Sequence, residues 1–142
     1  MPLGNFAHKE VLDAYLNATN ITAPANVYMA LFKSNPTGVD ATAWANEVSA
    51  TVDDTAYARQ LITFPASVLT DGFSLNDAAV TFAATVYGSG AAPYNATYFG
   101  IFNGATLGAG NLLFYDALFS PISRIATKSL AFPIDAVKVQ LF

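Results

Sequence analysis

Short runs of β-branched, aliphatic and aromatic residues recur along this chain, and glycine, proline or asparagine turns separate them. Runs of this length and spacing favour antiparallel strands, because a parallel sheet would require helical patterns between consecutive strands. The sequence therefore predicts a mainly β fold, an antiparallel β-sandwich or jelly roll of about seven to eight strands. The runs cover residues 26–33, 57–64, 78–86, 96–103, 111–118, 122–131 and 136–142.

The first and last of these runs differ in the pattern of their two faces. Residues 26–33 are apolar on both alternating faces, so we expect this strand to be covered on both sides. Residues 136–142 alternate, with Val137, Val139 and Leu141 on one face. This alternation predicts a strand that is buried on one face only.

The N-terminal segment, residues 1–18, has a helical pattern instead. Apolar residues recur at intervals of four, and the charged residues fall on another face. We expect a short helix from about residue 6 to residue 17, with the side chain of Asn5 as its N-cap. The apolar face includes Ala7, Val11 and Tyr15.

The chain is unusually poor in charge for its size. Of its 142 residues 54% are hydrophobic and 11% are charged, whereas about 25% is typical of soluble domains. One domain of residues 1–142 is expected from this length. The low charge predicts that part of its surface is buried against other subunits. The alternative is a well-packed β protein whose surface is polar but uncharged.

Several classes of partner and site do not fit this composition. The net charge of −4 and six Lys and Arg residues argue against a nucleic-acid partner. No apolar run approaches the roughly 20 residues that cross a bilayer, and the first residues lack the pattern of a secretion signal. We therefore expect no membrane association. The absence of cysteine excludes disulfides, thiolate metal ligands and cysteine nucleophiles.

The remaining chemistry-bearing residues do not combine into a catalytic motif. His8 is the only histidine, and no Gly-x-Ser-x-Gly turn is present. Asp53 and Asp54, with Asp40 and Glu47 nearby in the sequence, match no calcium loop, so a solvated turn is the simpler interpretation. The glycine-rich segment 104–110 lacks the lysine of a phosphate-binding loop and fits a hairpin. We expect no enzyme activity, cofactor or metal.

Four motifs in this order resemble a family of small virion structural proteins of tailed bacteriophages. The resemblance covers about residues 5–142 and carries structural signatures rather than catalytic ones. The motifs are the aliphatic strand Val27–Lys33 with its Asn-Pro-Thr turn, Glu47-Val-Ser, Tyr57-Ala-Arg-Gln, and the hairpin of Phe99-Gly-Ile-Phe and Asn111-Leu-Leu. This sequence departs from the pattern at Ala50, where glycine is usual, and in a longer connection over residues 51–56.

The resemblance implies a structural component of the virion, assembled in the cytoplasm of the host bacterium. Our first interpretation is a capsid decoration or cement protein that oligomerises and binds the major capsid protein or itself. The alternative is a tail or fibre-associated protein, which is how relatives of this pattern are often described. A second alternative is a carbohydrate-binding β-sandwich, in which Trp44, Tyr94 and Tyr98 would stack on sugars.

Arg59 is the most informative charge in the predicted strands, because Tyr57 and Leu61 lie on its own face. A guanidinium in such a place requires a partner unless it reaches solvent. The resemblance implies Glu47 as that partner. A solvated arginine is the alternative.

Two segments are candidates for contacts with neighbouring proteins. One is the N-terminal helix, with Val11 and Tyr15 on its apolar face, and the other is the long loop 34–56, which carries the only tryptophan, Trp44. An exposed tryptophan beside an apolar face is a typical interface anchor. In the alternative arrangement the helix and Trp44 close the two open ends of the sandwich.

Overall fold

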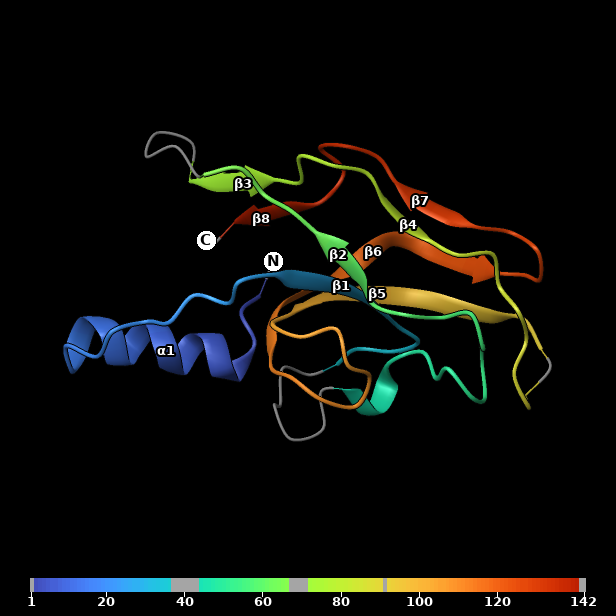
Figure 1. Ribbon diagram of the computed structural model, residues 1–142, viewed down its shortest axis with the longest axis horizontal. Coiled ribbons are helices and arrows are strands. Elements are labelled where there is room, and N and C mark those ends of the chain that lie inside the picture. Colours follow the sequence, from blue (N-terminus) through green and yellow to red (C-terminus); the bar gives the residue numbers. More distant parts are fainter. Residues whose placement is uncertain (1, 37–43, 67–71, 91, 141–142) are drawn as a thin grey trace.

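The computed structural model describes residues 2–36, 44–66, 72–90 and 92–140. It confirms a mainly β fold with an N-terminal helix, α1 (Asn5–Leu16). Eight strands lie within these ranges (Figure 1). They are β1 (Val27–Phe32), β2 (Gln60–Ile62), β3 (Phe73–Leu75), β4 (Val80–Phe82), β5 (Tyr94–Phe102), β6 (Leu112–Arg124), β7 (Leu130–Phe132) and β8 (Lys138–Gln140).

The strands form two layers. A four-stranded antiparallel sheet has the order β2-β1-β5-β6, with Met29 of β1 opposite Gln60 on one side and Ile101 on the other. Two short antiparallel pairs, β3 with β8 and β4 with β7, lie over one face of this sheet (Figure 1). The predicted sandwich is thus confirmed, with a second layer built from short pairs.

The main core lies between the two layers. Met29 and Leu31 of β1 pack in one buried cluster with Val80 and Phe82 of β4 and with Val137. The opposite face of β1 is also covered, because Ala30 and Phe32 form a second buried cluster with β5 and β6 residues. The prediction that this strand is buried on both faces is therefore confirmed.

The strand bounds differ from the sequence prediction in several places. The run 57–64 contributes only Gln60–Ile62 to the sheet, because the preceding residues carry side chains of a buried polar network. The runs 111–118 and 122–131 are not two strands, since β6 continues to Arg124 and only Leu130–Phe132 forms the next strand. The run 78–86 contributes only Val80–Phe82, and none of the predicted runs includes the strand β3. Residues 141–142 of the last predicted strand lie outside the described ranges.

The start of the chain is attached to the free edge of β6. Leu3 bridges Phe114, and the backbone N–H of Gly4 donates to the carbonyl oxygen of Leu113 at 2.7 Å. A Cβ atom at Gly4 would lie 2.0 Å from the carbonyl oxygen of Leu112, so this close approach requires glycine. Gly4 is also the N-cap of α1 and makes no side-chain bond, so the predicted Asn5 cap is wrong.

Candidate functional site

Helix α1 lies outside the sandwich, and its outer half extends away from the sheets (Figure 1). Within α1 only Ala7 is fully buried, and Val11 is partly buried. The exposed fractions are 56% for Leu12, 83% for Tyr15 and 75% for Leu16. We name these three residues the helix patch. A helix of 12 residues is only marginally stable alone, and most helices in proteins are stabilised by packing of their apolar face. The exposed helix patch therefore favours binding to another protein.

Polar side chains stabilise the last turns of α1. Lys9 forms an i, i+4 ion pair with Asp13, which also accepts a hydrogen bond from the Asn17 amide at 3.0 Å. These contacts raise the pKa of Lys9 and lower that of Asp13. These contacts modestly favour the helix that presents the helix patch.

A groove of about 520 Å³ lies where α1 meets the β layers. Phe6 forms one wall, the segment 22–26 forms another, and the start of the β5–β6 loop closes it. An open groove thus remains between α1 and the sandwich. The choice between α1 as an interface and α1 as a cap of this end stays a prediction.

Glu47 and Arg59 form a buried salt bridge. Arg59 Nε and Nη2 donate to the two carboxylate oxygens of Glu47 at 2.8 and 2.7 Å. Arg59 Nη1 donates to the carbonyl oxygens of Gly104 and Ala109 at 2.9 and 2.8 Å, and Cζ lies 3.6 Å from the ring centroid of Phe102. The solvated-arginine alternative is wrong, since Arg59 is 5% exposed. This pair ties segment 44–49 and the β5–β6 hairpin loop to the sheet.

Tyr57 completes this polar network. Its hydroxyl donates to Glu47 at 3.0 Å and accepts from the backbone N–H of Leu31 at 2.9 Å. Burial, and next the negative charge of Glu47, raise the pKa of the Tyr57 phenol well above its ordinary value. Because the acidic and basic groups here bind one another away from solvent, the network is suited to holding loops and not to acid–base chemistry.

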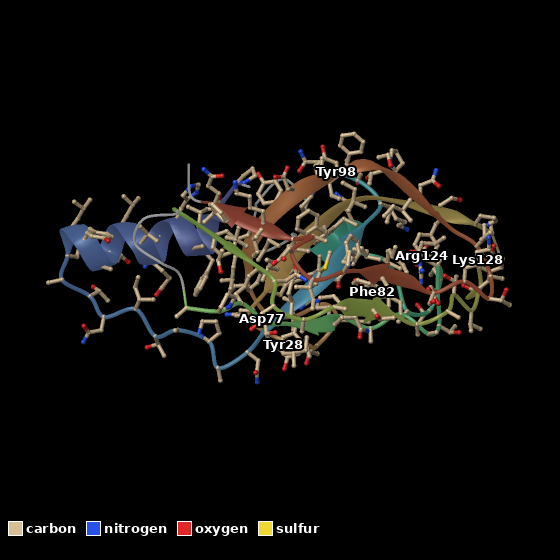
Figure 2. The ribbon with its side chains drawn as sticks, turned by 90° about the horizontal axis from the view of Figure 1, so that it is seen from above. Tyr28, Asp77, Phe82, Tyr98, Arg124 and Lys128 are labelled. Carbon is tan, nitrogen blue, oxygen red and sulfur yellow. The ribbon has the colours of Figure 1, made fainter. Side chains whose placement is uncertain are left out.

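A second buried network surrounds Asp54 at the end of the β body that is remote from α1, near Arg124 and Lys128 (Figure 2). Asp54 accepts from the Val86 backbone N–H at 2.9 Å and from the Tyr94 hydroxyl at 3.1 Å, and its Oδ2 lies 3.8 Å from Arg124 Nη2. Burial is the main cause that raises the pKa of Tyr94 to about 12.

This network corrects the sequence interpretation of Asp53 and Asp54 as a solvated turn. Asp54 is 1% exposed, and Asp53 is partly buried and pairs with Lys33 at 2.8 Å. Asp40 lies outside the described residues. Among the residues that are described, no group of three His, Cys, Asp or Glu side chains is placed to hold a metal ion.

Trp44 is partly buried at the start of a short 3-10 turn. With Val48 and Leu107 it lines a groove of about 400 Å³ between segment 44–51 and the tip of the β5–β6 loop. The preceding residues 37–43 of the long loop lie outside the described ranges. The sugar-stacking set does not assemble, because Tyr94 is buried in the main core and Tyr98 packs against the second cluster beside Phe32.

Comparison with known proteins places the chain in a family. Residues 2–140 match the family Gp80, described as podophage GP4 fiber I protein gp80. No curated protein matches the sequence significantly. The described part of the chain contains no helix that is long and apolar enough to cross a membrane. The family description favours the tail-fibre alternative over the capsid-cement interpretation. The chain belongs to the podophage GP4 fiber I protein gp80 family and is a structural component of the phage virion.

Proposed function

We propose that this protein is a non-enzymatic subunit of the tail fibre and that α1 attaches it to a neighbouring virion protein. Two observations support this proposal. The family match extends over residues 2–140, and a single ordered helix presents the helix patch outside the sandwich. A tail protein replaces the major capsid protein as the expected partner.

The helix patch has the chemistry of an anchor. Burying an aliphatic or aromatic side chain contributes about 1.5–3 kcal/mol, and tyrosine is enriched among the residues that dominate binding energies. Leu12 and Leu16 are one turn apart, with Tyr15 beside them, which is the spacing of helices that bind apolar grooves. Burial of these three side chains can hold the protein on a virion, because neighbouring subunits that are fixed in place raise the effective concentration of the binding site.

The basic residues do not support a nucleic-acid partner. Arg59 and Arg124 are buried in the two polar networks. Lys33 pairs with Asp53, and Lys138 lies 4.2 Å from the centroid of the Phe73 ring. Lys9 pairs with Asp13, so five of the six Lys and Arg residues already have contacts within the chain, which argues against a basic stripe that follows a phosphate backbone.

Incorporation into particles tests the proposed attachment. The double substitution Leu12→Ser and Leu16→Ser removes most of the helix patch and leaves the sandwich intact. Leu61→Ser is the matched control, because Leu61 is also an exposed leucine, at 51%, but lies on β2. Phage are grown with each variant as the sole copy, and the amount of the protein on purified virions is measured.

We expect the control to be incorporated like the wild type and the double variant to be reduced about tenfold or more, as for loss of an interface anchor. Thermal unfolding of the isolated proteins, with similar midpoints, shows that neither change unfolds the chain. Equal incorporation of the two variants would remove the helix patch from the proposal. Labelled protein on the capsid shell instead of the tail would overturn the fibre assignment.

A further inference from the structure

Strand β6 is interrupted where it faces β5. Ala117 pairs with Tyr98 and Ile122 pairs with Ala96, so residues 118–121 of β6 stand opposite Thr97 alone. A local excess of residues on one strand forms a bulge that projects from the sheet. Phe119 lies in this bulge with an exposed fraction of 108%, which is the largest among the large apolar residues described.

An apolar pocket of about 290 Å³ lies beside the bulge. Its walls include Phe99 of β5, Leu118 and Ile122 of β6, and Phe132 and Val137 from the second layer. Of the described residues that line it, none is ionisable, and Phe119 itself lies at the rim. A projecting aromatic ring and a pocket that fits an aromatic ring are thus neighbours on one surface.

The backbone edge of β6 is not available for pairing with another strand at this place. Pro121 has no N–H to donate, and the bulge removes residues 118–121 from a regular edge. Farther along β6, residues Pro2–Gly4 already occupy the edge beside Leu113 and Tyr115. A partner at this surface is therefore held through side chains.

We infer that Phe119 of one copy inserts into this pocket on a second copy, and that the second copy returns the same contact. A ring at the rim of its own receptor pocket makes the surface self-complementary, as a two-fold contact requires. None of the described residues that line the pocket is ionisable, so insertion of the ring buries no charge there, and the repulsion between two chains of net charge −4 acts only at longer range.

The area available sets the strength of this contact. A buried phenylalanine covers about 150–250 Å², so two rings with their pocket walls stay near or below about 1,200 Å² in total, which is the range of weak interfaces. The isolated protein should therefore dimerise only at high concentration. On a virion, where copies are held close together, the same contact is effectively strengthened. This inference does not depend on where the protein is attached.

Sedimentation velocity across the micromolar to millimolar range tests the inference on the purified protein. We expect a concentration-dependent dimer whose dissociation constant rises about tenfold or more in Phe119→Ser. Added salt should tighten the wild-type dimer, because it screens the repulsion between like charges. Val86→Ser, at another exposed apolar residue (54% exposed), is the control and should leave the dimer unchanged.

A second variant tests the pocket separately. Ala117→Glu places a carboxylate at the pocket lining and keeps Phe119. It should also lose the dimer, whereas an equal mixture of Ala117→Glu and Phe119→Ser should recover part of it, because one intact ring then meets one intact pocket. A wild-type monomer at all concentrations would overturn the inference. So would a dimer that Phe119→Ser leaves unchanged, or one that is lost only with the helix-patch double variant.

Discussion

Replacing Arg59 with alanine should destabilise this protein more than any surface substitution. The guanidinium and the Glu47 carboxylate are buried, with side-chain exposed fractions of 0% and 4%. Removal of the guanidinium leaves the carboxylate with the Tyr57 hydroxyl as its remaining side-chain donor. The carbonyl oxygens of Gly104 and Ala109 also lose their donor.

The expected loss follows from these contacts. Breaking a buried ion pair by removing one partner costs about 3–5 kcal/mol, because an uncompensated charge stays buried. The hairpin loop can open to rehydrate its carbonyl groups, so we add nothing for them. The loss is large against a total stability of about 5–15 kcal/mol for a domain. Lys33→Ala breaks the half-exposed pair with Asp53 and should cost at most about 1 kcal/mol.

A double-mutant cycle with urea unfolding measures the pair itself. Glu47→Ala alone leaves the guanidinium without its carboxylate, and the double variant leaves neither charge buried. The loss of unfolding free energy in the double variant should therefore be smaller than the sum of the two single losses, by roughly 2–3 kcal/mol. A coupling within about 0.5 kcal/mol of zero would show that the two side chains act independently and would refute this reasoning.

Three further predictions concern stability. Burial raises the pKa of Tyr94 from 10.0 to about 12, so the folded protein keeps a proton that the unfolded chain releases. Stability should hold below pH 10 and fall toward pH 12 in urea titrations at stepped pH, and Tyr94→Phe should make this decline shallower, with the remainder due to the buried Tyr57, whose pKa is also raised. Gly4→Ala should detach the start of α1 from β6 and speed amide exchange there, whereas Gly104→Ala, where a new Cβ meets nothing within 4 Å, should not. The buried Asn76 side-chain amide forms hydrogen bonds with three backbone groups, so Asn76→Ala should lower the free energy of unfolding in urea by about 2–4 kcal/mol. Asn95→Ala, at an exposed position, should leave it unchanged.

Much of the sandwich follows from local pattern. The apolar faces of β1 predict burial on both sides, and the glycine-rich segment 104–110 predicts the hairpin between β5 and β6. The pairing of Glu47 with Arg59 follows from the family pattern together with the burial expected of an arginine on an apolar strand face. The same reasoning applied to Arg124, which also lies among apolar residues, would have indicated the second network.

The features that were missed depend on contacts between distant parts of the chain. Asp54 looks like a turn residue beside Asp53, and its main partners, Val86, Tyr94 and Arg124, are far away in the sequence. The bulge around Phe119 likewise has no local signal, because it arises from the register that β5 imposes on β6. Three-residue strands such as β3 form only because a distant partner supplies their hydrogen bonds.

The position of this protein on the virion tests the central claim most directly. Electron cryo-microscopy of the intact particle, at a resolution that separates helices from sheets, would locate the sandwich and α1. The account predicts the sandwich in the tail fibre, with the helix patch of Leu12, Tyr15 and Leu16 buried against a neighbouring virion protein. A sandwich bound across the capsid shell, or an α1 that extends into solvent with no neighbour, would contradict it.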